Sequence, residues 1–290
     1  MSVQVEFWFI STDHLTDRIW FRDDDDFKMG MNLVAVLACV LSVNVLAFIL
    51  MSNHVHFVLA CPYEKAEAFI EEYKRRYSQY LSRKYRLKET LRRVGYRIDP
   101  VDGNDESLEC VVAYVQMNSV AANITLTPNG YLWGTGDVFF AESKGSRHRL
   151  EKYSKRALRR MLHSKVKLPP NLLLSDSGYI LPESYVDVQF VETLFRTPKR
   201  MLYFLQSSSK AKRRLSSEEN LPAIRDQVIV SAIPDLCQSL FGKPDIASLT
   251  EAEKSELLKQ LRYRFSSYVN QLARVTGMSY ETVVRLLDKV

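Results

Sequence analysis

The sequence predicts a mixed fold of strands and helices, an α/β or α+β sandwich, followed by a helical C-terminal region. Three observations support this. Short runs rich in β-branched and aromatic residues recur before residue 61, as in "VQVEFWFIS" at 3–11. A long polar stretch with apolar residues at helical spacing follows at 64–86, and residues after about 220 look helical throughout. Strands and helices that alternate within the first 140 or so residues indicate one layered domain.

The elements can be placed by periodicity and by their breakers. A polar loop containing His14 follows the first strand, and the turn "SNH" separates two apolar strands. The predicted order is strand 3–11, helix 32–42, strand 45–51, strand 55–60, helix 64–86, loop 97–107 and helix 107–123. The loop is predicted from its Pro, Gly, Asn and Asp residues.

Residues 31–51 form an apolar run that is long enough to span a bilayer. Asn32, Ser42 and Asn44 interrupt the run, and the flank before it, "RDDDDF", is acidic. We therefore predict a helix and a strand here, and no membrane segment.

Composition indicates a globular protein with a basic balance. Of its 290 residues, 46% are hydrophobic and 26% charged, and the net charge of +6 permits a polyanionic partner. The four cysteines are scattered without a C-x-x-C pair, which argues against a disulfide framework or a zinc ribbon. This usage fits a reducing compartment, and the N-terminus lacks the basic start of a signal peptide, so we expect a cytoplasmic protein.

Composition shifts predict three regions, at 1–143, 144–215 and 216–290. The second begins with a strongly basic segment, 144–167, in which ten Lys and Arg accompany one acid, Glu151. It ends in a polar, charged stretch at 207–222 that is typical of a linker.

His54 and His56 lie on either side of Val55 at the start of the third predicted strand. Side chains two residues apart in a strand lie on the same face, so His54 and His56 project together while Val55 turns into the opposite layer. Two neighbouring neutral imidazoles form half of a site for a divalent metal. Alternatively, each ring is satisfied by a nearby backbone carbonyl, and this pair alone leaves both interpretations open.

The helix at 107–123 adds two further candidates. Tyr114 and Asn118 are four residues apart and so share one helical face. A phenol can act as a nucleophile, and an amide oxygen can bind a hard cation. A tyrosine that attacks a metal-held phosphate would conserve the bond energy as a phosphotyrosine, so that rejoining needs no external energy source. Tyr114 can equally be an ordinary amphipathic-helix tyrosine with a solvated hydroxyl.

A nucleic-acid surface is predicted at 72–97, where ten Lys and Arg and five Tyr accompany two Glu. Cations follow phosphates and aromatic rings stack on bases, the combination that proteins use for single strands. The alternative is a solvated helix face whose tyrosines pack on the core. The predicted DNA contacts of this stretch are Lys74, Arg75, Arg76, Tyr77, Tyr80, Arg83, Lys84 and Tyr85.

Together these residues resemble the single-tyrosine HUH transposases, which are IS200-like, and most closely their REP-associated tyrosine transposase branch. The segments that carry the resemblance are "IWFRDDDDF", "VLAFILMSNHVHFVLA", "YKRRYSQYLSRKY" and "YVQMNSVAANI". Family members show an "IF-x-D-x-x-D-F" start, an "A-x-x-x-M-x-N-H-x-H" strand and a "Y-I-x-x-N-P-V-x-A" helix, in this order. The resemblance covers about residues 3–140, roughly half of the chain.

The resemblance implies a ferredoxin-like antiparallel sheet, with Tyr114 as the nucleophile and His54, His56 and Asn118 as ligands of Mg²⁺ or Mn²⁺. It also implies single-stranded or hairpin DNA as the substrate, a 5′-phosphotyrosine and a free 3′-OH as products, and either a monomer or a homodimer. Two departures are Ser119 in place of the usual proline, and "LRRVGYRIDPVDG" in place of the usual "G-H-x-x-x-x-R" stretch.

The C-terminal residues 263–290 resemble a helix-turn-helix. Apolar positions suit two short helices, Gly277 suits the turn, and Ser279 is a good N-cap. The second helix would enter the major groove of DNA, with Ser279, Tyr280, Thr282 and Arg285 as the exposed contacts. The alternative is a helical hairpin used for dimerisation.

The sequence thus predicts a metal-dependent transposase-like enzyme that nicks and joins single-stranded DNA. The alternative is a domesticated DNA-binding or regulatory protein that keeps the fold but no longer cleaves. A hydrolase that uses His54 and His56 to activate water is disfavoured, because no carboxylate base lies beside the pair in the sequence.

Overall fold

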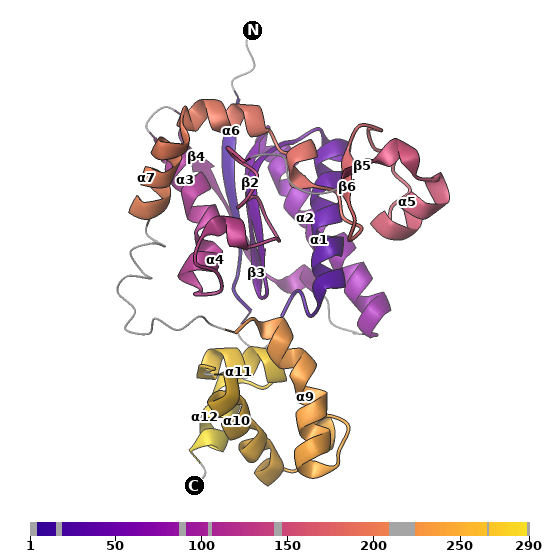
Figure 1. The fold of residues 1–290 in the computed structure, drawn as a ribbon, viewed down its shortest axis with the longest axis vertical. Coiled ribbons are helices and arrows are strands. Elements are labelled where there is room, and N and C mark those ends of the chain that lie inside the picture. The colour runs from indigo at the N-terminus through magenta and orange to yellow at the C-terminus, as the bar shows by residue number, and fades with distance from the viewer. Residues whose placement is uncertain are drawn as a thin grey trace.

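The computed structural model describes residues 5–15, 19–86, 91–103, 106–141, 147–208, 224–265 and 267–288. It has an N-terminal unit around a sheet and a C-terminal unit of helices, which lies below the sheet in Figure 1. This confirms the predicted mixed fold with an antiparallel sheet.

The main sheet has four antiparallel strands in the order β2-β3-β1-β4. Their bounds are β1 Phe7–Thr12, β2 Asn44–Met51, β3 His54–Ala60 and β4 Tyr96–Val101. Strand β3 lies inside the sheet, where His56 pairs with Ser11 of β1 on one side and with Ile49 of β2 on the other. The two histidines predicted on one strand therefore lie on a central strand.

Strand β4 corrects the prediction of a loop at 97–107. Pro100 is one of the residues that predict a loop, but it lies within β4, an edge strand that pairs only with β1 among the described strands. Proline is tolerated on an edge strand, because one side of that strand needs no hydrogen-bond donor.

Helices cover both faces of the sheet. Helices α1, Asp24–Leu41, and α2, Tyr63–Tyr85, lie on one face, and α3, Ser107–Gln116, lies on the other (Figure 1). The ring of Phe57 in β3 contacts Phe69 and Tyr73 of α2, each with 5.2 Å between ring centroids. His54 and His56 alternate with Phe57 along β3, so they face α3.

The apolar run 31–51 divides into the last part of α1 and all of β2, as predicted. Helix α1 starts earlier than expected, because Asp23 is its N-cap and accepts a hydrogen bond from the Asp26 amide at 2.9 Å. The helix ends at Leu41, and Ser42 follows with a left-handed φ of 51°. No helix in the described ranges is both long and apolar enough to cross a bilayer.

Residues 147–208 add a small two-stranded sheet and three α-helices to this unit. Strands β5, Arg147–Arg149, and β6, Leu173–Ser175, pair with each other, and the further helices are α5 Lys155–Leu162, α6 Val188–Phe195 and α7 Pro198–Ser207. Val191 and Phe195 of α6 and Phe204 of α7 are buried in the same core as the sheet. Helices α6 and α7 thus extend the core around the sheet, a role that the sequence of this segment does not predict.

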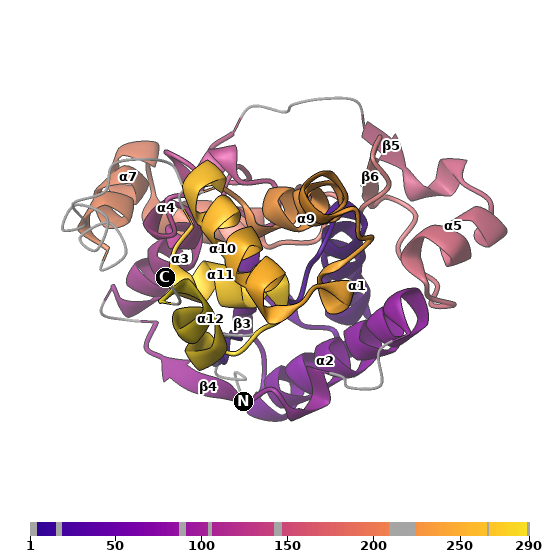
Figure 2. The same cartoon turned by 90° about the horizontal axis from the view of Figure 1, so that it is seen from below.

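The C-terminal unit is helical in its described residues, as predicted. It consists of α9 Asp226–Phe241, α10 Glu251–Phe265, α11 Val269–Thr276 and α12 Tyr280–Leu287, seen in front of the sheet from below in Figure 2. It has its own buried core, which includes Ile229, Leu258 and Leu272. Apart from residues 207 and 208, the predicted linker at 207–222 lies outside the described residues.

Candidate active site

Three histidines form a cluster at one end of the sheet. His54 and His56 begin β3, and His14 follows the last residue of β1 by two positions. One ring nitrogen of each can be chosen so that all three lie within 4.8 Å of one another. The rings of His14 and His54 are stacked with 3.7 Å between centroids, and those of His54 and His56 are 4.8 Å apart. His54 and His56 are buried, whereas His14 is exposed, which leaves the cluster open on one side.

Backbone and side-chain bonds hold the His14 loop against the turn between β2 and β3. The side-chain Nδ2 of Asn53 donates to the Leu15 carbonyl at 3.0 Å. The backbone N–H of Leu15 donates to the backbone carbonyl of Asn53 at 3.1 Å. Asn53 Oδ1 also lies 2.9 Å from His54 Nδ1. On the other side of the strand Val55 is fully buried, as predicted. Hydrogen bonds therefore hold together the two backbone segments that carry His14 and His54.

Tyr114 lies next to this cluster. Its ring, on α3, meets the ring of His56 edge-on with 5.9 Å between centroids, and that of Phe9 with 5.7 Å. The side chain is half-buried and lines a cavity together with Phe9 of β1 and Phe204 of α7. The structure thus brings together Tyr114 and the histidine pair, which lie about 60 residues apart in sequence.

Asn118 lies one helical turn beyond Tyr114, but not in one unbroken helix. The predicted helix 107–123 is interrupted at Met117, and Asn118 starts the short helix α4, Asn118–Ala121. Its amide nitrogen donates to the carbonyls of Tyr114 at 2.9 Å and Val115 at 3.1 Å. These bonds leave the amide oxygen as the atom that can face a cation. Asn118 lines one cavity of about 350 Å³ together with His14 and His54.

On helix α2 the structure contradicts part of the predicted DNA surface. Tyr77 is fully buried and Lys74 is 3% exposed, so neither reaches the surface. The Tyr77 hydroxyl donates to the Trp20 carbonyl at 2.9 Å, and the Lys74 ammonium lies 3.4 Å from Glu71 and over the ring of Tyr96. These two side chains stabilise the core, because α2 turns the stripe that carries them toward the sheet.

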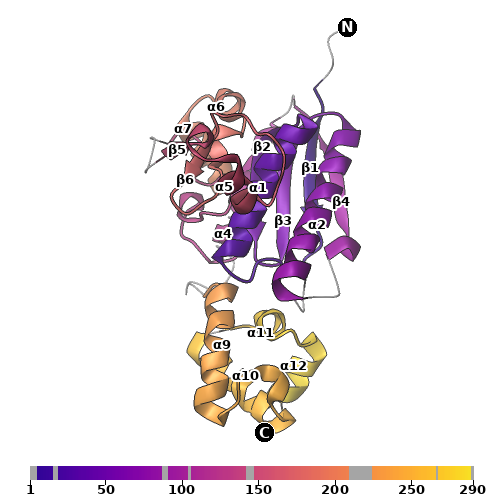
Figure 3. The ribbon, with the colours of Figure 1, turned by 90° about the vertical axis from the view of Figure 1, so that its right-hand side faces the viewer.

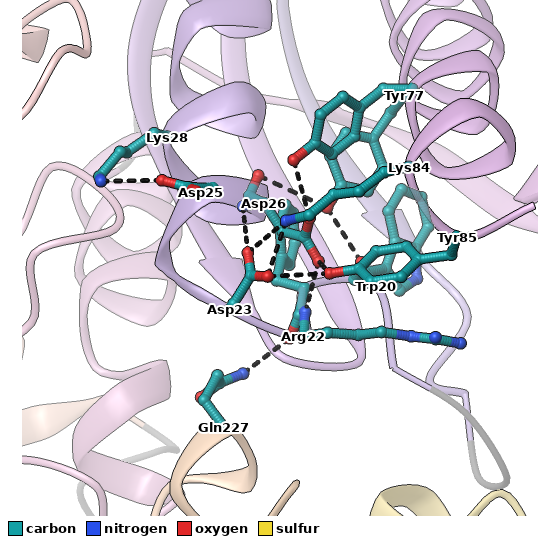
Figure 4. A network of polar contacts seen from close by, with 12 residues as sticks. Trp20, Arg22, Asp23, Asp25, Asp26, Lys28, Tyr77, Lys84, Tyr85 and Gln227 are labelled. Atoms are coloured by element: carbon teal, nitrogen blue, oxygen red, sulfur yellow. Dashed lines mark hydrogen bonds and ion pairs between the residues drawn. The ribbon is translucent and has the colours of Figure 1, made fainter. Parts of the chain in front are cut away.

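Three more predicted contacts belong to a polar network with the acidic start of α1 (Figure 4). The hydroxyls of Tyr80 and Tyr85 each donate to the buried Asp26 carboxylate at 2.9 Å. The Lys84 ammonium bridges Asp26 at 2.8 Å and Asp23 at 2.7 Å. Burial acts to lower the pKa of Lys84, but these hydrogen bonds outweigh it and raise the pKa. Lys84 therefore stays charged and is engaged within the protein.

The other cations of α2 are nearer to solvent. Arg75 and Arg76 both bind Glu72, each at 2.8 Å, and the hydrogen bond from Arg75 is the main cause that lowers the pKa of Glu72 to about 2. Arg83 is exposed and makes no ion pair with another described residue. Of the predicted cations on this helix, Arg83 is the one that the structure leaves open to a phosphate.

The C-terminal candidates lie on or beside α12. Gly277 ends α11 with a φ of +70°, and the Ser279 hydroxyl caps α12 by accepting from the Thr282 amide at 3.2 Å. Tyr280 is 49% exposed, and the exposed Arg285 pairs with Glu251 at 3.2 Å. The turn and the cap agree with the sequence, whereas contact with DNA stays a prediction.

Comparisons with known proteins agree with the sequence resemblance. The family described as "Transposase IS200 like" matches residues 20–118, about a third of the chain. This match confirms the predicted resemblance to the IS200-like transposases over that segment, which contains both strand histidines and Tyr114.

One solved structure also matches, that of a REP-associated tyrosine transposase bound to a REP hairpin. It has 10% sequence identity and a TM-score of 0.35, and the match covers 46% of this chain and 78% of that one. A likeness at this level does not by itself indicate a common fold. No curated protein matches the chain.

His14 belongs to the cluster, although its local sequence does not predict this. The pairing of β1 with β3, in which Ser11 lies opposite His56, carries the chain after β1 past the start of β3. His14 then lies beside His54. A histidine shortly after the first strand was the available signal, but its meaning depends on that strand pairing.

Proposed function

We propose that this chain is a metal-dependent, IS200-like tyrosine transposase that cleaves and rejoins single-stranded DNA, with Tyr114 as the nucleophile. The observation that carries the proposal is the convergence of three separate elements on one point. These are the β3 histidines, the His14 loop and the Tyr114 helix, with 5.9 Å between the rings of His56 and Tyr114.

The donor set fits a divalent cation. Three imidazoles whose ligand nitrogens lie within 4.8 Å of one another provide neutral nitrogen donors, and Asn118, which lines the same cavity as His14 and His54, offers an amide oxygen of the kind that Mg²⁺ and Mn²⁺ prefer. We propose His54, His56 and Asn118 as ligands of Mg²⁺ or Mn²⁺, with His14 as a further ligand. The bound cation would polarise the scissile phosphate and stabilise its developing charge.

The chemical step belongs to Tyr114. Its phenolic oxygen attacks the phosphorus and forms a phosphotyrosine ester with the 5′ phosphate of the downstream strand. The bond from phosphorus to the 3′ oxygen breaks, and that oxygen takes up a proton in place of the one lost by the phenol. The bond energy is kept in the ester, so a 3′-OH can reverse the step and rejoin a strand.

The fold supports the same assignment. The order β1-α1-β2-β3-α2-β4 with a β2-β3-β1-β4 sheet supports a ferredoxin-like domain within residues 1–143. We propose that residues 144–215 connect it, through α6 and α7, to a DNA-binding domain at 216–290. In that domain α11 and α12 would form a helix-turn-helix. We propose hairpin DNA as the partner, with Arg83 among the contacts.

The test is covalent capture of DNA. Wild type, Tyr114→Phe and a matched control, Tyr203→Phe on the exposed face of α7, are incubated with single-stranded hairpin DNA from the region flanking the coding sequence and Mn²⁺. We expect a protein–DNA adduct that survives denaturation with wild type and Tyr203→Phe but not with Tyr114→Phe.

Two results would count against the proposal in different ways. An adduct that persists in Tyr114→Phe would assign the nucleophile elsewhere. Tight DNA binding without an adduct in any variant would favour the domesticated DNA-binding protein over the transposase.

A further inference from the structure

Three residues of the candidate active site line a cavity whose second wall comes from the C-terminal unit. On the sheet side this cavity of about 350 Å³ is lined by His14, His54 and Asn118. On the other side, α9 and α11 and the residues just before them line it. Figures 1 and 3 show these helices against the end of the sheet where β3 begins.

Asp226 fixes this second wall in place. It is 4% exposed, and its carboxylate accepts a hydrogen bond from the Ser52 hydroxyl in the β2–β3 turn at 2.6 Å. The same carboxylate accepts from Gln271 at 2.9 Å and from Arg274 at 3.1 Å, both on α11. Next to it, Gln227 donates to the Phe21 carbonyl at 2.8 Å. One buried acid therefore joins α11 to the turn that directly precedes His54.

The charge of the cavity is positive. Among its described lining residues Asp226 is the only acid, and its negative charge is balanced by Arg274. Arg225 also lines the cavity, is exposed, and makes no ion pair with any residue that the structure describes. One cation thus stays available opposite the histidines.

An aromatic ring accompanies this cation. Tyr268, the N-cap of α11, lines the cavity and is 55% exposed. The exposed Asn270 lies beside it and offers both a donor and an acceptor. A cation for phosphate and a ring for a base are the pair of groups that bind single-stranded nucleic acid.

We propose that this cleft holds the single-stranded nucleotides next to the scissile phosphate, with Arg225 on a backbone phosphate and Tyr268 stacked on a base. The inference rests on the proposed function and extends it to a unit that lies outside the segment matched to the transposase family. A cavity of about 350 Å³ lies within the size range of pockets that hold drug-sized molecules, such as a nucleotide. The C-terminal unit would then contribute residues to the cleavage site, in addition to binding DNA through the proposed helix-turn-helix.

The test is equilibrium binding in EDTA, which separates substrate binding from the chemical step. Fluorescence anisotropy is measured with labelled oligo-deoxythymidylate and with the flanking-region hairpin carrying a single-stranded extension. Arg225→Gln and Tyr268→Ala are compared with Arg262→Gln and Tyr263→Ala. The control residues are exposed on α10 of the same unit and lie outside the cavity lining.

We expect Tyr268→Ala to weaken binding by roughly tenfold, within the range of one lost base stack. Arg225→Gln should lower the slope of log K against log salt by about 0.7, the value for one phosphate contact on a single strand. The controls should stay within about twofold of wild type. Circular dichroism checks that each variant is folded.

Two failures can be told apart. If wild type forms the Tyr114 adduct but both cleft variants bind like their controls, the cleft proposal is wrong and the proposed function stands. If wild type neither binds either probe nor forms the adduct, the proposed function and this inference both fail.

Discussion

Replacing Asp26 with alanine tests whether the acidic run before α1 is a structural device. The Asp26 carboxylate is fully buried and accepts from the hydroxyls of Tyr80 and Tyr85, the Lys84 ammonium and the Arg22 amide, all within 2.9 Å. In Asp26→Ala, Lys84 and Tyr85 keep Asp23 as a partner, at 2.7 and 3.0 Å. The Tyr80 hydroxyl and the Arg22 amide lose this acceptor.

The expected loss in the free energy of unfolding comes from these two donors, the Tyr80 hydroxyl and the Arg22 amide. Each donor left without its acceptor costs about 1–3 kcal/mol when buried. Tyr80 is only half-buried and can recruit water, which favours the lower half of the range. We therefore expect Asp26→Ala to lower the free energy of unfolding by about 3 kcal/mol, the lower limit of about 3–5 kcal/mol for breaking a buried ionic pair.

The assay is urea unfolding at neutral pH followed by circular dichroism, with Asp25→Ala as the matched control. Asp25 precedes Asp26 in the same helical turn, but its side chain is 73% exposed and pairs only with Lys28 among the described residues. Its loss removes a weak surface pair and a favourable interaction with the helix dipole, together about 1 kcal/mol or less. Equal losses for the two variants would refute the assignment of Asp26 as the buried centre of the network.

Two further predictions concern the metal site and the basic helix. His14→Ala should weaken Mn²⁺ binding, measured by calorimetry, by at least roughly tenfold, because even the loss of a residue that hydrogen-bonds a metal ligand has an effect of that size. The control His148→Ala should bind Mn²⁺ like wild type. Equal affinities for His14→Ala and wild type would exclude His14 as a ligand. Because the pKa of Glu72 is lowered to about 2 in the folded state, mainly by Arg75, its ion pair stabilises the fold above the ordinary carboxyl pKa and is lost as the pH falls toward 2. Glu72→Gln should therefore lower the midpoint of thermal unfolding at about pH 7 but not near pH 2, and a difference that persists in acid would contradict this reasoning.

The sequence was informative wherever the relevant spacing is local. Alternation along a strand places His54 and His56 on one face, and helical periodicity places Asn118 one turn from Tyr114. Both relations depend only on backbone geometry over a few residues. The apolar run 31–51 likewise divides into helix and strand close to the polar residues that interrupt it.

The tertiary structure decided everything that depends on which segments pair. His14 joins the site because β1 pairs with β3, and Tyr77 is buried because α2 turns that side toward the core. Likewise, Asp226 lies some 170 residues beyond the strand turn that it binds. No local pattern encodes such contacts, because they arise from the burial of apolar surface by the whole chain. The sequence by itself therefore determined the candidate chemistry of the site, whereas its third histidine and its second wall required the fold.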